Sequence, residues 1–197
     1  MSQKFVFDER FVRAFTPGTH KVLGVVLKPF SYWHKFQLEL CDSPFVTAEA
    51  VRFEDLERAV GICQTQYPQQ YKEPKLSRWR KYKEIWRAAM NDLPKACRDF
   101  DRYLQAYVSS PKIMQKDKDT GGTKIIDIEP ALMEVAFYTK MTGCRSEEAW
   151  NMSIGELSWL NAAMARTEGA DFSVITPVDD AALAQLRALK AAREAKQ

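Results

Sequence analysis

The stretch KLSRWRKYKEIWRAAMNDLPKACRDFDRYLQAYV, residues 75–108, decides the fold that the sequence predicts. In its first half, aromatic and apolar residues recur three or four positions apart, which places them along one side of an α-helix. In its second half the same spacing resumes after Pro94, a residue suited to a first helical turn. The stretch therefore predicts two consecutive helices. Their apolar positions are Trp79, Tyr82, Trp86 and Met90 in the first helix, and Cys97, Phe100, Leu104 and Tyr107 in the second.

A basic segment coincides with the first of these helices. Between Lys72 and Arg87, seven basic residues stand against two acidic ones, in a chain whose net charge is only +3. Basic side chains between aromatic ones could contact phosphates and stack on bases. The alternative is that the aromatic side chains pack inward while the basic ones stay in solvent. The basic face of this helix consists of Arg80, Lys83 and Arg87.

The composition of the 197-residue chain is that of an ordinary folded domain. Its hydrophobic fraction of 46% is enough for a core, and its charged fraction of 28% does not suggest disorder. We expect a mainly helical domain over residues 1–176 and a charged helix or tail over residues 177–197. No apolar run approaches the roughly 20 residues that cross a bilayer, and the first residues lack a secretory pattern. The expected location is therefore the cytoplasm.

The residues that precede this stretch predict one strand and two helices. Residues 21–27 are rich in valine and leucine, which is typical of a strand. Ser31 is a suitable N-cap for the first helix. The second helix is expected over residues 53–66. The residues expected on one side of each element are Leu23, Val25 and Leu27 in the strand, Trp33, Phe36 and Leu40 in the first helix, and Leu56, Val60 and Cys63 in the second.

The residues that follow this stretch predict further helices and a small β-element. A hairpin is expected around Gly121 and Gly122. Pro130 is suited to the first turn of the next helix. Ser153 and Glu156 have the spacing of a capping box, which predicts the start of another helix.

A final helix is expected after Asp179, with a thin apolar stripe made of Leu183, Leu186 and Leu189. Such a helix can form on intrinsic propensity but has little to bury alone. The predicted fold class is therefore mainly α. It comprises about seven helices, a small β-strand or hairpin element and a loosely attached C-terminal helix.

The sequence contains no recognisable catalytic motif. It has two histidines, His20 and His34, and neither has a second metal ligand at helical spacing. The motifs of phosphate-binding loops and of serine nucleophiles are absent. We therefore expect no enzymatic activity, no cofactor and no metal, with His34 at the surface or half-buried. The four widely spaced cysteines are expected to be reduced core residues.

Two regions of the chain carry a resemblance to a known family. The first contains VLGVVLKPFSYWHKFQLELCDSPFV, residues 22–46, followed by the helical segment FEDLERAVGICQ, residues 53–64. The second is EEAWNMSIGELSWLNAAMARTEGADF, residues 147–172. Together they cover about a third of the chain. This order of segments resembles the small helical tail assembly proteins, or tail assembly chaperones, of tailed bacteriophages and prophages.

The resemblance implies a non-enzymatic role in tail assembly in the host-cell cytoplasm. Such a protein would keep the tape-measure protein competent for assembly and recruit tail-tube subunits, and it could act as a homo-oligomer. This role needs exposed apolar side chains that hold another polypeptide. The candidate partner-binding residues are Trp79, Tyr82, Trp86, Met90, Leu183, Leu186 and Leu189.

Two alternative functions stay open at this point. A structural virion subunit, such as a connector or tail-completion protein, would have the same helical composition. A nucleic-acid-binding module could use the basic aromatic helix over residues 75–92, and its binding would weaken with salt.

Overall fold

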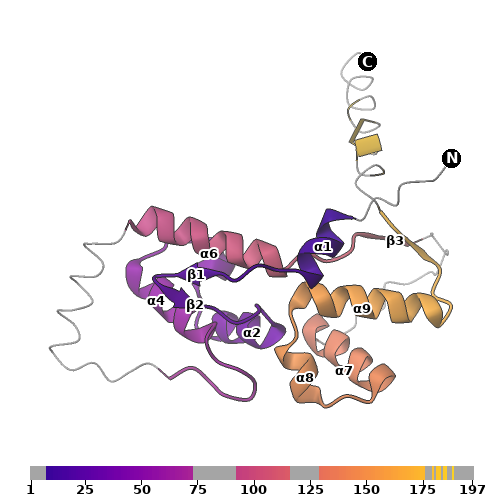
Figure 1. Ribbon diagram of the computed structural model, residues 1–197, viewed down its shortest axis with the longest axis horizontal. Coiled ribbons are helices and arrows are strands. Elements are labelled where there is room, and N and C mark those ends of the chain that lie inside the picture. The colour runs from indigo at the N-terminus through magenta and orange to yellow at the C-terminus, as the bar shows by residue number, and fades with distance from the viewer. Residues whose placement is uncertain are drawn as a thin grey trace.

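The computed structural model describes residues 8–72, 92–115 and 129–175, with several residues between 179 and 188. Within these residues the fold is mainly helical with two short antiparallel β-pairs, which confirms the predicted fold class (Figure 1). The helices are α1 (Glu9–Phe15), α2 (Tyr32–Leu40), α3 (Pro44–Thr47), α4 (Phe53–Ile62), α6 (Leu93–Tyr107), α7 (Pro130–Thr142), α8 (Ser146–Asn151) and α9 (Ile154–Thr167). The strands are β1 (Lys21–Val22), β2 (Val25–Val26), β3 (Ile113–Gln115) and β4 (Phe172–Val174).

The described helices form two groups that lie beside each other (Figure 1). The N-terminal group comprises β1, β2, α2, α3, α4 and α6. The C-terminal group comprises α7, α8 and α9. Helix α1 contacts both α6 and α9, so it packs against both groups.

The strand predicted over residues 21–27 is instead a hairpin, and that prediction was wrong. Strands β1 and β2 pair antiparallel, with Val22 opposite Val25. Leu23 and Gly24 occupy the turn with φ angles of 51° and 77°, and two positive φ angles are typical of a type I′ turn. A run of valine and leucine fits one strand or two short ones. Leucine is not a typical turn residue, so the sequence did not reveal the reversal.

Helix α2 begins after its N-cap Ser31, as predicted, but its buried side is not the predicted one. Trp33 is 7% exposed, whereas Phe36 and Leu40 are 40% and 65% exposed. His34 is 1% exposed, which corrects the expectation of a surface or half-buried histidine. The apolar spacing was misleading because a polar ring whose nitrogens are hydrogen-bonded can replace an apolar side chain in a core.

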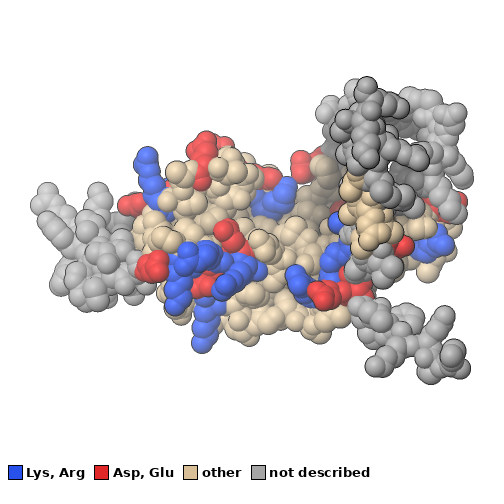
Figure 2. Space-filling model, turned by 90° about the horizontal axis from the view of Figure 1, so that it is seen from above, with Lys and Arg blue, Asp and Glu red and all other residues tan. Residues whose placement is uncertain are grey.

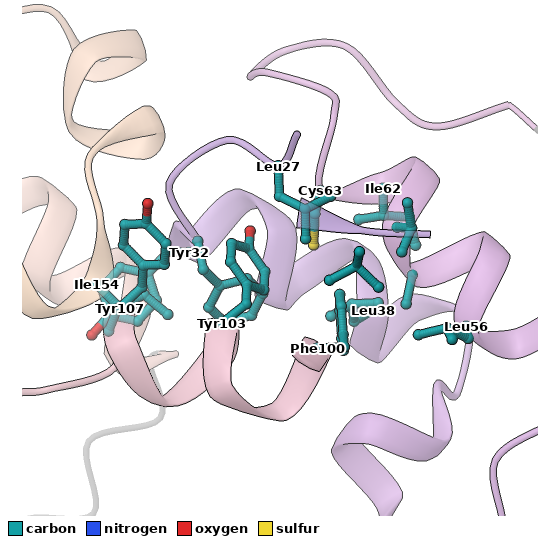
Figure 3. Close-up of a cluster of buried hydrophobic side chains, with 14 of the residues drawn as sticks. Leu27, Tyr32, Leu38, Leu56, Ile62, Cys63, Phe100, Tyr103, Tyr107 and Ile154 are labelled. Carbon is teal, nitrogen blue, oxygen red and sulfur yellow. The ribbon is translucent and has the colours of Figure 1, made fainter. Parts of the chain in front are cut away.

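Helix α6 supplies the centre of the core. It begins after Asp92, with Pro94 in its first turn as predicted. Phe100 and Tyr103 are both 0% exposed, and the Tyr103 hydroxyl donates a 2.8 Å hydrogen bond to the Lys28 carbonyl oxygen. The side chains of this core come from α2, α4 and α6, with further ones from β1, α7, α8 and α9, and those drawn in Figure 3 gather in one cluster.

The predicted buried side is confirmed for α4 but not fully for α6. In α4 the prediction is confirmed, because Leu56, Val60 and Cys63 are all buried. In α6 the stripe is rotated, because Cys97 and Leu104 are only partly buried. The buried α6 residues are Ala96, Phe100, Tyr103 and Tyr107.

The two groups meet where α9 begins. Ser153 caps α9 by accepting a 3.2 Å hydrogen bond from the Glu156 amide, which is one of the two hydrogen bonds of the predicted capping box. The Ile154 amide donates a 3.1 Å hydrogen bond to the Phe30 carbonyl oxygen, which joins α9 to the start of α2. A Cβ at Gly155 would lie 3.0 Å from two backbone carbonyl oxygens at the end of α6, so glycine permits this close approach.

Strands β3 and β4 pair antiparallel, although the sequence did not predict their pairing. Ile113 lies opposite Val174. The hairpin predicted around Gly121 and Gly122 lies outside the described residues, and so it stays a prediction. The described residues between 179 and 188 are helical and exposed.

Candidate functional site

All of the residues that the sequence singled out for partner binding lie outside the described part of the chain, so their roles stay predictions. The same holds for the basic face. On the face shown in Figure 2, the described basic and acidic side chains are interspersed, with uncharged surface between them. The partner-binding candidates outside the described residues are Trp79, Tyr82, Trp86, Met90, Leu183, Leu186 and Leu189, and those of the basic face are Arg80, Lys83 and Arg87.

The described residues form an open apolar groove with a volume of about 980 Å³. One side is formed by α2, α3 and the end of α6, and the other by α7, α9 and the two strands β3 and β4. On α9 the lining residues recur at helical spacing, so the helix presents one continuous face to the groove. These α9 residues are Ile154, Ser158, Asn161, Ala162 and Ala165.

The edge of this groove exposes large apolar side chains. Val46 and Met133 are each 42% exposed, and Val108 and Ile113 are each 44% exposed. They come from four different segments that border one groove. Large apolar side chains gathered in this way are typical of surfaces that bind another molecule.

A polar cluster lies within the same lining. The Ser158 hydroxyl donates a 2.9 Å hydrogen bond to a Glu134 carboxylate oxygen. The Asn161 Nδ2 group donates a 2.9 Å hydrogen bond to the Glu134 backbone carbonyl oxygen. Asn161 is 9% exposed, and its Oδ1 atom is buried with no hydrogen-bond partner. The cluster therefore contains an acceptor that no protein group uses.

Tyr32 completes the polar cluster from α2. Burial raises the pKa of its phenol well above the usual value, and the negative charge of Glu134 adds to this rise. A hydrogen bond with Ser158 acts in the opposite direction. The phenol is therefore neutral at physiological pH and keeps its proton for hydrogen bonding.

The lining of this groove is mostly apolar and carries a few polar side chains. Its lining includes a serine and a carboxylate, but none of the described lining residues is a histidine or cysteine. Across the described ranges, no three histidine, cysteine, aspartate or glutamate side chains gather in a way that could hold a metal ion. The groove can thus offer apolar contact together with a few hydrogen bonds.

A serine and a histidine do lie close together elsewhere, at the start of α2. The Ser31 hydroxyl oxygen is 3.3 Å from His34 Nδ1. Both residues are buried, at 0% and 1% exposed, and the His34 Nε2 atom lies 3.0 Å from the Thr65 carbonyl oxygen. This pair therefore caps a helix inside the core and has no access to a substrate.

The cysteines have the character that the sequence predicted. All four are free, and Cys63 is fully buried. Burial raises the pKa of the Cys63 thiol to about 12, so it stays protonated. Cys41, Cys97 and Cys144 are partly buried against the same core.

The groove cluster was not predicted from the sequence. Tyr32, Glu134 and Ser158 belong to three helices that are distant along the chain, and each is an unremarkable residue on its own helix. Only the mutual packing of the helices brings these side chains together. A serine and an asparagine three positions apart on α9 form the one local sign, because that spacing places both on one side of a helix.

No protein-family model, curated protein or solved structure matches this chain. Among the described residues, no helix has the length and apolar character that crossing a membrane requires.

Proposed function

We propose that this protein acts by binding another polypeptide, without catalysing a reaction, and that the groove between its two helix groups receives an apolar segment of the partner. The observation that carries this proposal is the groove of about 980 Å³ with four exposed apolar side chains at its edge. Covering such side chains removes apolar surface from water, which is the main driving force of protein association.

A helical segment is a suitable occupant for this groove. Amphipathic helices commonly bind by placing apolar residues at helical spacing into a groove between other helices. The groove runs along one face of α9, where Ala162 and Ala165 are small residues that leave room for a partner's side chains. Met133 on α7 and Val46 on α3 would then contact the bound segment from its two sides.

The resemblance to tail assembly chaperones supports a more specific form of this proposal. In that form the protein is a tail morphogenesis factor of a bacteriophage or prophage, and its partners are the tape-measure protein and the tail-tube protein. A chaperone of a long amphipathic client needs an apolar surface that releases the client during assembly. The apolar side chains exposed at the edge of the groove support this form of the proposal.

Two variants on adjacent α7 residues test whether the groove is the binding surface. Met133 lines the groove and is 42% exposed, whereas Leu132 is 49% exposed and is not part of the lining. Each would be changed to glutamine, and each variant would be co-expressed with a tape-measure protein of a tailed bacteriophage. We expect Met133→Gln to reduce the co-purified complex and Leu132→Gln to retain it.

Circular dichroism of both variants is the control for folding. Equal recovery of the complex with both variants, when both are folded, would contradict the proposal that this groove holds the partner. An absence of any complex between the wild-type protein and the tape-measure protein would contradict the tail assembly form.

A further inference from the structure

We propose that the polar cluster in the groove is a subsite for one cationic side chain, a lysine or an arginine, of the polypeptide bound there; this inference rests on the proposed function. It concerns Asn161, Glu134, Ser158 and Tyr32. Three observations support it: an unused buried acceptor, a negative charge beside it, and an apolar path leading to both.

The unused acceptor is Asn161 Oδ1. The side-chain amide has a defined orientation, because its Nδ2 group donates to the Glu134 backbone carbonyl oxygen at 2.9 Å. Turning the amide over would place two oxygens against each other. Oδ1 therefore stays buried and without a partner, on a residue that lines the groove. Only a group that donates a hydrogen bond can satisfy it, and a buried polar atom without a partner is destabilising.

The negative charge belongs to Glu134. Its carboxylate accepts a hydrogen bond from Ser158, and it takes part in none of the salt bridges among the described residues. The one lysine or arginine among the described lining residues, Lys35, forms a 2.6 Å salt bridge with Glu39 on its own helix. A cationic partner group thus complements the charge of this end of the groove.

The shape of the lining favours a cation carried on an apolar stem. Phe137, Ala162 and Ala165 line the groove together with the polar cluster. Lysine and arginine pack their methylene groups against apolar surface while the charged end reaches polar groups. Their ends supply three and five hydrogen-bond donors respectively, enough to serve both Asn161 and Glu134. An acidic side chain would be repelled, and an apolar one would leave Asn161 Oδ1 unsatisfied.

The test uses two synthetic amphipathic helical peptides of about five turns. They differ at one position in the middle of the apolar face, which is lysine in one peptide and norleucine in the other. Binding to the full-length protein is measured by calorimetry, and octylamine serves as a probe for a free amphiphile. The protein variants are Glu134→Gln, which keeps the shape of the side chain but removes its charge, and Glu54→Gln on α4 as the matched control.

We expect the wild-type protein to bind the lysine peptide about tenfold more tightly than the norleucine peptide, because the lysine gains charge-assisted hydrogen bonds. Glu134→Gln should abolish most of this preference, and Glu54→Gln should retain it. Equal binding of the two peptides by the wild-type protein, or a preference that survives in Glu134→Gln, would overturn the inference. Binding of octylamine without either peptide would overturn it as well, because the ligand would then be a small amphiphile.

The outcomes separate this inference from the proposed function. If both peptides bind equally and Met133→Gln weakens both, the groove binds polypeptides and only the cation subsite is wrong. If neither peptide binds and the tape-measure complex is unaffected by Met133→Gln, both the inference and the proposed function are wrong.

Discussion

The centre of the core, in α4 and α6, and the exposed side of α7 differ in how completely they bury apolar side chains. In the N-terminal group, Leu56, Phe100 and Tyr103 are 0% exposed. In the C-terminal group, the adjacent residues Leu132 and Met133 on α7 are 49% and 42% exposed. Burial of apolar area is the main favourable contribution to folding. The difference indicates that the centre of the core supplies much of the stability, whereas the exposed side of α7 leaves apolar side chains in solvent.

The largest expected effect comes from the centre of the N-terminal group. Phe100→Ala removes a ring that packs against Phe45 at 4.5 Å and Tyr103 at 5.5 Å between centroids. We expect the free energy of unfolding to fall by about 3–5 kcal/mol, because a large buried side chain is lost and a cavity is left. Urea unfolding followed by circular dichroism measures the change.

Met133→Ala in the groove is the companion variant. Because Met133 is already 42% exposed, we expect it to lower the free energy of unfolding by much less than Phe100→Ala does. Similar losses for the two variants would remove the distinction between the core centre and the exposed side of α7.

The helices of the fold were predictable because each has local signals of its own. Ser31, Ser153 and Pro94 mark helix starts at the positions where the structure has them. Gly143 follows α7 with a φ angle of 69°, as a glycine that ends a helix commonly does. Such signals depend on neighbours within one turn of the chain, which is why they can be read from the sequence.

The buried sides and the groove were less predictable because they depend on partners distant in the sequence. His34 is buried since Ser31 and Thr65 provide hydrogen bonds to its ring, and only the fold brings Thr65 there. The pairing of β3 with β4 joins segments far apart in the chain. The groove cluster likewise joins side chains from α2, α7 and α9, and the spacing of Ser158 and Asn161 on α9 is its one local sign.

An intermediate effect is expected where the two groups meet. Gly155→Ala would place a Cβ 3.0 Å from the carbonyl oxygens of Tyr107 and Ser109 and 3.3 Å from Ala14 Cβ. Because two of these contacts are with backbone, α9 must shift away from the end of α6. We expect the free energy of unfolding to fall by about 1–3 kcal/mol, the usual range for overpacking.

Gly18→Ala is the matched control, because nothing lies within 4 Å of a Cβ at that position. Its free energy of unfolding should change little in the same urea titration. If Gly155→Ala is as stable as Gly18→Ala, the two groups are not packed as tightly at their junction as the structure indicates.

The smallest expected effect is a pH dependence that arises in the N-terminal group. Burial lowers the pKa of His34 from its usual 6.5, and the nearby charge of Lys28 lowers it further, whereas a hydrogen bond with the Thr65 carbonyl oxygen acts in the opposite direction. The Ser31 amide donates to Nδ1 at 3.1 Å, so the neutral ring carries its proton on Nε2. A second proton on Nδ1 would face that amide and break the cap of α2.

The sign of the effect follows from these protonation states. Since the folded pKa lies below 6.5, the unfolded chain binds more protons just below that pH, and stability is lost as pH falls from about 6.5 toward the folded pKa. One such group changes the free energy of unfolding by at most about 1.4 kcal/mol per pH unit.

Burial also lowers the pKa of His20, so His20 contributes to the pH dependence with the same sign. Urea unfolding between pH 7.5 and 5 should therefore show a loss of stability that is reduced in His34→Gln and largely kept in His20→Gln. If His34→Gln retains the full pH dependence, the loss of stability at low pH does not come from His34 and must arise from other titrating groups.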